Sequence, residues 1–230
     1  MSSVRATQPP EPQKPWTPPP GATELILARH GASADAIEGE PFEMLEGRGN
    51  PPLSPLGERQ AELLAGRLAS ARFSRLYVTP LVRTQQTAAP LARATGLEPV
   101  VVADLVEVSL GQWSDGEYRL RVARGDPTVG RVHRQERWDL IPGAEAKEVF
   151  TERIHRGMRA VALQTGPDRA AVCVVHGGVI AEVLHQLLGC MPFAFVHVEN
   201  ASITRVVRLA DGRWRVRCFN DTAHLAALSR

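Results

Sequence analysis

Four short apolar runs along the chain have the pattern of buried β-strands. Residues 25–28 (Leu-Ile-Leu-Ala) and 171–175 (Ala-Val-Cys-Val-Val) contain no charged residue, and residues 76–78 and 100–102 form two shorter runs. A strand that is apolar on both faces is typical of a parallel sheet covered on both sides. The chain therefore predicts at least four strands, and residues 25–28 are suited to burial on both faces.

Helical patterns separate these strands. Ser54 and Pro55 form a favourable N-cap and first-turn pair, so a helix is predicted to begin there and to bury the leucines that follow. Further helices are predicted near residues 81–95 and from Gly178 through Leu188. Strands that alternate with helices indicate an α/β fold, a three-layer sandwich whose mostly parallel sheet has helices on both faces.

The last part of the chain predicts a different kind of pairing. Residues 202–209 and 213–218 both read as strands, and Asp211-Gly212 between them is a hairpin signal. Strands joined by a short hairpin are antiparallel. We therefore expect an antiparallel edge on the sheet.

The N-terminal segment lies outside this pattern. Residues 1–21 carry seven prolines, which disfavour helix and sheet pairing and predict a disordered, polyproline-like tail before a single catalytic domain over residues 22–230. The tail has two interpretations, an inert extension, which we favour, or a docking ligand that gives the protein a weak partner.

Residues 112–145 give no clear strand or helix pattern. A long irregular segment in a compact α/β domain is usually a functional lid, so we interpret this one as an insertion over the active site. Between Arg119 and Arg137 it holds six arginines. They either select anionic substrates or form a solvated face with Glu117, Asp126 and Glu136 as partners, and we weigh the two equally.

Composition narrows the function classes. The formal charge of +2 is too small to predict nucleic-acid binding. Three cysteines without a CxxC pair argue against disulfides and a zinc site, and predict three packed thiols in a reducing compartment. The sequence shows neither an apolar stretch of the roughly 18 residues needed for a membrane span nor a signal-peptide pattern. We therefore expect a cytoplasmic protein without membrane contact.

Three polar residues follow predicted strands. His30 comes after residues 25–28, Arg83 after residues 76–78 and His176 after residues 171–175. Ligands of open α/β sheets bind at the carboxyl ends of the strands, so these side chains should converge. A neutral imidazole can attack phosphorus without a metal, and guanidinium groups match the oxygens of a transferring phosphoryl group. This set predicts phosphoryl transfer with no metal and no cofactor.

Five ordered motifs resemble those of the histidine phosphatase superfamily, the family that includes the cofactor-dependent phosphoglycerate mutases. They are Leu27-Ala28-Arg29-His30-Gly31, Leu53-Ser54-Pro55-Leu56-Gly57, Thr79-Pro80-Leu81-Val82-Arg83-Thr84, Leu105-Val106-Glu107 and Val174-Val175-His176-Gly177-Gly178. The resemblance spans about residues 24–225 and implies a phosphoglycerate mutase-like fold. It implies His30 as nucleophile and Glu107 as proton donor and base. It also implies that Arg29, Arg83 and His176 form the phosphate pocket.

Two further residues are candidates for binding the phosphate. Gly177 lets a helix N-terminus approach an anion closely, and Ser33 either donates its hydroxyl to the phosphate or forms a turn. The chain also departs from the family pattern. Ala36 stands where many members have asparagine, which removes one side-chain contact to the phosphate.

The resemblance favours a phosphatase over a mutase. The long insertion typical of the mutases is missing, and residues 219–225 resemble the phosphatase branch. We therefore predict a phosphomonoester hydrolase for a small phosphorylated metabolite. The alternatives are a mutase-type phosphotransferase and, less favoured, a non-catalytic module that binds a phosphorylated ligand or a partner. The sequence leaves open whether the chain forms a homodimer.

Overall fold

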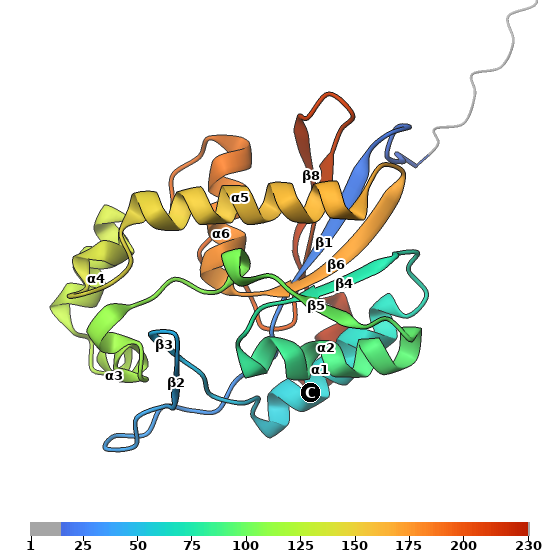
Figure 1. The fold of residues 1–230 in the computed structure, drawn as a ribbon. Coiled ribbons are helices and arrows are strands. Elements are labelled where there is room, and N and C mark those ends of the chain that lie inside the picture. Colours follow the sequence, from blue (N-terminus) through green and yellow to red (C-terminus); the bar gives the residue numbers. More distant parts are fainter. Residues whose placement is uncertain (1–14, 230) are drawn as a thin grey trace, which may run out of the picture.

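The computed structural model describes residues 15–229, and its centre is a six-stranded sheet (Figure 1). In sheet order the strands are β5 (Pro99–Val101), β4 (Arg75–Val78), β6 (Arg169–Val175), β1 (Thr23–Arg29), β7 (Ile203–Arg208) and β8 (Trp214–Asp221). The first four run parallel, whereas β7 and β8 pair antiparallel. The predicted mostly parallel sheet with an antiparallel edge is confirmed.

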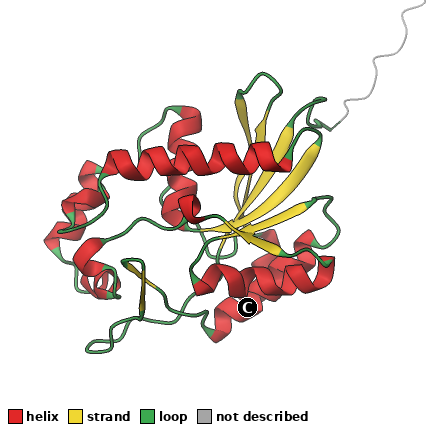
Figure 2. Ribbon diagram, in the orientation of Figure 1, coloured by secondary structure: helices red, strands yellow, loops and turns green. Residues whose placement is uncertain are grey.

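Helices cover both faces of the sheet (Figure 2). Helices α1 (Pro55–Leu68) and α2 (Val82–Thr95) lie on one face, and α5 (Lys147–Thr165) and α6 (Gly177–Leu188) on the other. Alternate residues of β1 face opposite layers: Leu25 and Leu27 pack with α5 and α6, and Ile26 and Ala28 pack with α1 and α2. The apolar run therefore contributes side chains to the hydrophobic cores on both faces of the sheet, as expected for a central strand.

Local sequence explains where several elements begin and end. The Ser54 hydroxyl accepts a hydrogen bond from the Gly57 amide at 3.2 Å, and Pro55 is the first residue of α1. Gly212 has φ of 87° in the turn between β7 and β8, a conformation that glycine adopts without strain. Both signals were read correctly from the sequence.

The predicted lid contains helices that the sequence analysis missed. It holds α3 (Glu117–Ala123) and α4 (Pro127–Gln135), with single 3₁₀ turns at Gly111–Trp113 and Trp138–Leu140. The prediction that residues 112–145 lack regular structure is therefore wrong. Asp126 caps α4 by accepting from the Thr128 amide at 2.7 Å, and this cap followed by proline was a readable signal. The helices are short, so neither shows a long apolar period.

Helix α5 was also missed. Its buried residues Phe150, Ile154, Met158 and Val161 recur every three or four positions, as expected for an amphipathic helix. Its N-cap residue, Ala146, makes no side-chain hydrogen bond, so no capping signal marked the start of the helix.

Other predictions have mixed outcomes. Over residues 15–229, no helix combines the length and the apolar character needed to cross a membrane. All three cysteines are free, but only Cys173 is fully buried, and Cys190 and Cys218 are half-buried. Most of the predicted tail, residues 1–14, lies outside the described residues. In its remaining part the Trp16 ring lies 4.7 Å from the Arg217 guanidinium of β8.

Candidate active site

The carboxyl ends of three neighbouring parallel strands bring the predicted residues together. His30 follows β1, His176 follows β6, and Arg83 lies in the first turn of α2 after β4. The ring centroids of His30 and His176 are 5.2 Å apart, and the Arg83 Nε–H points at His30 Nε2 over 3.2 Å. The convergence expected from strand order is therefore observed.

The hydrogen bonds of His30 define which nitrogen is free. Nδ1 lies 2.7 Å from the Gly31 carbonyl oxygen, which can only accept, so the proton of the neutral ring belongs on Nδ1. Nε2 then carries the lone pair, consistent with its position as acceptor from Arg83. Burial, together with the charges of Arg83 and Arg29, lowers the pKa of His30 well below 6.5. His30 is therefore a neutral imidazole with a lone pair beside an arginine.

His176 lies fully buried next to this ring. Its Nε2 is 2.9 Å from the Thr79 hydroxyl, which also contacts the Thr84 hydroxyl at 3.1 Å. Its Nδ1 is buried without a hydrogen-bond partner among the described residues, and so is Nε of Arg29. A buried polar group without a partner is costly, so both groups are candidates to bind a ligand such as a phosphoryl group.

The Glu107 carboxylate lies against the start of α6. Oε2 accepts from the Gly178 amide at 3.2 Å and Oε1 from the Val108 amide at 3.0 Å. The carbonyl oxygen of Glu107 accepts from Arg48 Nε at 2.6 Å and from Arg153 Nη2 at 3.1 Å. Both the backbone and the side chain of Glu107 are thus held in place.

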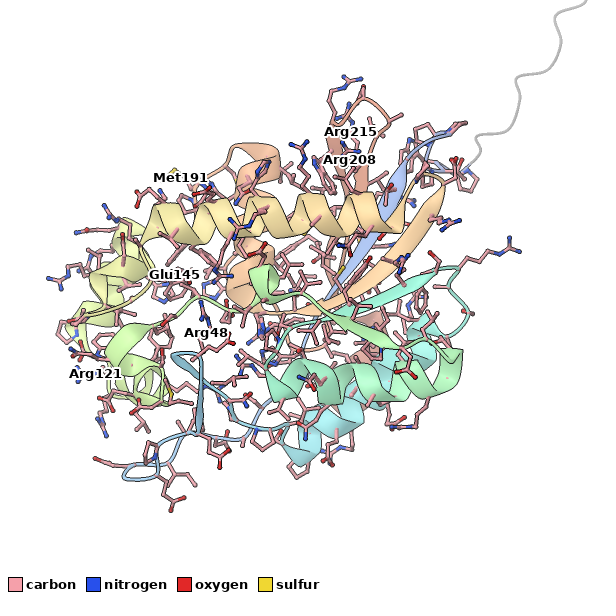
Figure 3. The ribbon with its side chains drawn as sticks, viewed as in Figure 1. Arg48, Arg121, Glu145, Met191, Arg208 and Arg215 are labelled. Carbon is pink, nitrogen blue, oxygen red and sulfur yellow. The ribbon has the colours of Figure 1, made fainter. Side chains whose placement is uncertain are left out.

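An ion-pair cluster of Arg48, Glu145 and Arg153 provides this support. The Glu145 carboxylate is 2.6 and 2.8 Å from Arg153 and 3.3 Å from Arg48 (Figure 3). Burial alone would raise the pKa of Glu145, but its bonds to Arg153 outweigh this and lower it. The cluster therefore stays charged and connects the start of α5 to the hairpin of β2 (Met44–Leu45) and β3 (Arg48–Gly49).

Position 178 requires a glycine because the Glu107 carboxylate lies close to its backbone. A Cβ added to Gly178 would lie 2.6 Å from Glu107 Oε1, closer than real Cβ contacts, so Gly178→Ala must displace the carboxylate. We expect kcat to fall about 30-fold, less than the roughly 10²–10⁴-fold of a complete loss of general acid–base catalysis, because the carboxylate is displaced and not removed, with a small change in melting temperature. Steady-state kinetics beside a melting curve would check this, with Gly66→Ala on α1, which has open space around its Cβ, as the control. Unchanged kcat in Gly178→Ala would contradict the placement.

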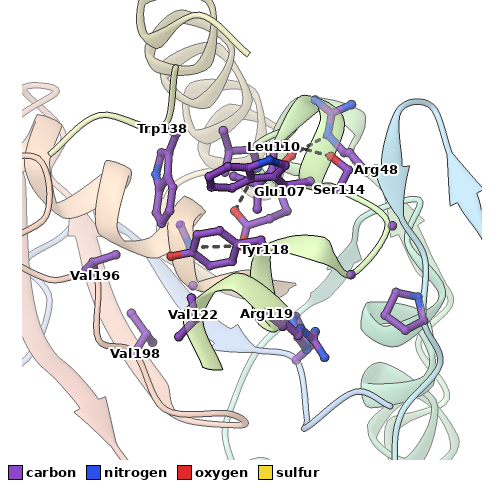
Figure 4. A pocket seen from close by; sticks show the side chains of 18 of the residues that line it. Arg48, Glu107, Leu110, Ser114, Tyr118, Arg119, Val122, Trp138, Val196 and Val198 are labelled. Carbon is purple, nitrogen blue, oxygen red and sulfur yellow. Dashed lines mark hydrogen bonds between the residues drawn. The ribbon is translucent and has the colours of Figure 1, made fainter. Parts of the chain in front are cut away.

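The site opens into a cavity of about 570 Å³. Five predicted residues line it: Arg29, His30, Arg83, Glu107 and Gly177. His176 lies beneath the cavity and does not line it. The outer walls come from the lid and from the loop before β7, and Figure 4 shows Tyr118 and Trp138 there together with Val122, Val196 and Val198. The outer walls are thus rich in aromatic and aliphatic side chains, with the polar residues His133, His197 and Glu199 among them.

Ser33 does not line the cavity. Its hydroxyl accepts from Arg119 Nη2 at 2.7 Å, and Arg119 Nη1 also donates to the Ala34 carbonyl oxygen at 2.8 Å. Arg119 does line the cavity, so the lid supplies a cation next to the loop where Ala36 replaces the family asparagine. The structure therefore assigns Ser33 a contact with the lid.

The other lid arginines do not line the cavity. Arg121 and Arg124 pair with Glu117, and Arg121 also pairs with Asp126; Figure 3 shows Arg121 at the outer edge of the molecule. Arg137 pairs with Asp139. Arg121 and Arg124 therefore fit the solvated-face interpretation with its expected partners Glu117 and Asp126. Glu136 instead accepts from the Phe193 amide, and among the six arginines Arg119 alone lines the cavity.

Sequence reasoning missed several residues that hold the site. Asn200 Nδ2 donates to the His30 carbonyl oxygen at 3.0 Å, and the Asn220 side chain accepts from the Glu199 amide at 2.8 Å. Arg153 had a readable signal, because a charged residue on the apolar stripe of an amphipathic helix must find buried partners. Arg48 lies in the two-residue strand β3 and Asn200 lies in a turn, and neither segment has a pattern that gave such a signal.

The two buried histidines predict an acid-sensitive fold. Burial lowers the pKa of His176 as well, helped by the charges of Arg83 and His30. The unfolded chain binds protons near pH 6.5 while the folded chain does not, so stability is complete above that pH and lost below it. We expect the free energy of unfolding to fall by about 1.4 kcal/mol per pH unit for each histidine below pH 6.5.

Urea unfolding between pH 7.5 and 5.5 would measure this slope. His176→Gln should reduce the slope of the free energy of unfolding against pH by the contribution of one histidine. His155→Gln, at an exposed position on α5, should leave the slope unchanged. Equal slopes in wild type and His176→Gln would contradict the neutral buried state.

Sequence comparison identifies relatives over nearly the whole chain. A family model, "Histidine phosphatase superfamily (branch 1)", matches residues 25–222. A bifunctional protein of Mycobacterium tuberculosis is 34% identical over 215 residues, which make up 91% of this chain and 57% of that protein. The chain thus spans little more than half of that relative. A Yersinia enterocolitica protein named "Probable phosphoglycerate mutase GpmB" is 30% identical over 218 residues, covering 88% of this chain and 94% of its own.

Two solved structures share the fold. A phosphoglycerate mutase from Bacillus anthracis superposes with a TM-score of 0.74 at 22% identity, covering 92% of this chain and 98% of its own. A mycobacterial glucosyl-3-phosphoglycerate phosphatase superposes with a TM-score of 0.70 at 26% identity, covering 87% and 100%. The predicted phosphoglycerate mutase-like fold is confirmed, and proteins described as mutases and as phosphatases both adopt it.

Proposed function

We propose that the chain, which belongs to branch 1 of the histidine phosphatase superfamily, is a phosphomonoester hydrolase that forms a phosphohistidine on His30. The observation that carries the proposal is the state of His30, a neutral imidazole whose free Nε2 lies beside the Arg83 guanidinium. A nucleophile needs that lone pair, and the attacked phosphoryl group needs that cation.

In the first step His30 Nε2 attacks phosphorus, the P–N bond forms and the bond to the ester oxygen breaks. Glu107, protonated at this stage, gives its proton to the leaving oxygen. Arg29 and Arg83 balance the charge of the phosphoryl oxygens, and the Gly177 amide at the N-terminus of α6 adds a donor. If the Thr79 hydroxyl donates to His176 Nε2, the neutral ring carries its proton on Nδ1 and donates it to a phosphoryl oxygen.

In the second step water attacks the phosphohistidine. The Glu107 carboxylate takes a proton from the water, the P–N bond breaks and inorganic phosphate leaves. His30 returns to the neutral form with its lone pair on Nε2. Arg83 remains cationic throughout, since burial lowers its pKa only to about 10.

A mutase is the second candidate, because the Yersinia relative carries that name. A phosphoglycerate has a carboxylate in addition to its phosphate, so a mutase needs a further free cation. The Arg48 guanidinium, which lines the cavity, already donates to the Glu46 and Glu107 carbonyl oxygens and to Glu145. Arg119 is bonded to Ser33 and Ala34. These engaged arginines favour hydrolysis.

Phosphate release from a panel of phosphomonoesters, measured with a chelator present, tests the proposal. We expect turnover that does not depend on added metal. Isomerisation of 3-phosphoglycerate faster than its hydrolysis would favour the mutase. Binding of phosphomonoesters without turnover would favour the non-catalytic module, and loss of activity on chelation would contradict the metal-free step.

A further inference from the structure

The outer half of the cavity has a composition that phosphoryl transfer does not explain. Its walls carry Trp113, Tyr118 and Trp138 together with Val122, Val196 and Val198, and we call this set the aromatic wall. A phosphoryl group held by Arg29 and Arg83 fills only a small part of 570 Å³. The rest of the substrate, which becomes the leaving alcohol, must therefore lie against the aromatic wall.

The rings of the wall form one connected surface. The centroids of Tyr118 and Trp138 are 5.8 Å apart with their planes at 75°, and those of Trp113 and Tyr118 are 6.5 Å apart with their planes at 29° (Figure 4). Arg121 covers Trp113 with its guanidinium 4.6 Å from the ring. The wall is thus held in place by lid contacts and does not depend on a ligand for its order.

The wall offers few free polar groups. The Tyr118 hydroxyl is 3.1 Å from His133 Nε2, and burial raises its pKa to about 12, so it stays a neutral phenol. The Ser114 hydroxyl accepts from the Leu110 amide at 3.0 Å. A sugar that bound here would lose hydrogen bonds to water and find few replacements, which costs affinity.

Val122 lies on the solvent-exposed side of the outer half of the cavity. It lies on α3, is 48% exposed and lines the cavity, while most other exposed residues of α3 are charged or small. Burying an exposed valine against an apolar ligand lowers the free energy of the complex. Flat rings pack well against the tyrosine and tryptophan beside it.

We propose that the aromatic wall is the subsite for the leaving group, and that it takes the flat, uncharged, aromatic part of a phosphomonoester. This assignment rests on the proposed hydrolase function and names its substrate class. It also disfavours sugar phosphates and phosphorylated acids, because the aromatic wall itself has few polar partners for them and the polar lining residues next to it include His197 and Glu199, which alternate with Val196 and Val198.

Three alkyl phosphates of similar intrinsic reactivity test the assignment: 2-(2-naphthyl)ethyl phosphate, octyl phosphate and glycerol 3-phosphate. We expect kcat/KM for the naphthyl ester to exceed that for glycerol 3-phosphate about 100-fold or more, because the wall binds the ring in the transition state. Equal or better hydrolysis of glycerol 3-phosphate would overturn the inference and leave the hydrolase function intact. Failure to hydrolyse any of the three, or further esters of the panel, would instead contradict the hydrolase function. Octyl phosphate hydrolysed as well as the naphthyl ester would overturn the assignment to a flat group.

Val122→Asn tests the wall directly, because this exposed position can change without disturbing the lid core. We expect the ratio of kcat/KM between the naphthyl and glycerol esters to fall about tenfold. Val149→Asn, on an exposed part of α5 outside the cavity, is the matched control and should leave the ratio unchanged. An unchanged ratio in Val122→Asn would show that the wall serves only the packing of the lid, and would overturn the inference.

Discussion

Replacing His30 with alanine is expected to lower kcat/KM at least ~10⁴-fold, because among residues 15–229 no other side chain presents a free imidazole lone pair to the phosphoryl group. The fold should survive, since His30 contributes one ring to a site whose backbone Asn200 and Ala201 hold through the His30 carbonyl oxygen. The measurement is phosphate release from the best ester of the panel, beside a melting curve. His155→Ala, the same change at an exposed position of α5, should keep wild-type activity.

Loss of activity alone does not prove covalent catalysis, because His30 could act as a base for water. A substrate labelled on phosphorus distinguishes the two roles. If His30 is the nucleophile, wild-type protein quenched in base during turnover carries the label, an acid quench removes it, and His30→Ala stays unlabelled. Wild-type protein that turns over but never carries label under either quench, with rapid sampling, would count against the phosphohistidine.

The positions of His30, Arg83 and His176 were predictable because they depend on topology. Parallel strands whose carboxyl ends meet at one edge bring together whatever follows them, and short apolar runs locate those strands in the sequence. Glu107 was placed through its motif, and its carboxylate does lie near the start of α6. Periodicity and strand order were therefore sufficient for these three residues, whereas Glu107 needed the family resemblance.

The walls of the cavity were not predictable in the same way. Tyr118 and Val122 reach the cavity only because α3 folds back over the site, and the orientation of such a short helix depends on tertiary contacts. Ser33 shows the same limit, since its hydroxyl meets Arg119, which lies 86 residues further along the chain. The sequence located the reacting groups, whereas the residues that surround the substrate depend on long-range packing.

Arg153 links helix α5 to the segment that carries Glu107. It lies on the buried face of α5, yet its Nη1 donates to the carbonyl oxygens of Asp104 at 2.9 Å and Val106 at 2.6 Å, and its Nη2 to that of Glu107. The segment that carries the proposed proton donor has only the short 3₁₀ helix Ala103–Leu105, and three of its carbonyl groups accept from one guanidinium.

Replacing Arg153 with methionine is expected to destabilise the protein by about 3–5 kcal/mol, the cost of leaving a buried partner charge uncompensated. The change preserves most of the side-chain volume, but it removes the nearer of the two arginines that pair with Glu145, whose side chain is only 9% exposed. It leaves that carboxylate with Arg48 at 3.3 Å and the Ser109 amide, and it leaves buried carbonyl groups unpaired. Urea unfolding at pH 7.5 measures the loss. Activity should also fall in the variant that remains folded, because Glu107 loses a backbone contact.

Arg156→Met is the matched control for this prediction. Arg156 lies three residues along the same helix and pairs with Asp104, but its side chain is 59% exposed, so its loss should leave the free energy of unfolding nearly unchanged. A similar small cost in Arg153→Met would show that water replaces the guanidinium, and the ion-pair cluster would then have no role in holding Glu107. A large cost that Glu145→Gln partly relieves in the double variant would show that the unpaired carboxylate, more than the lost volume, destabilises the fold.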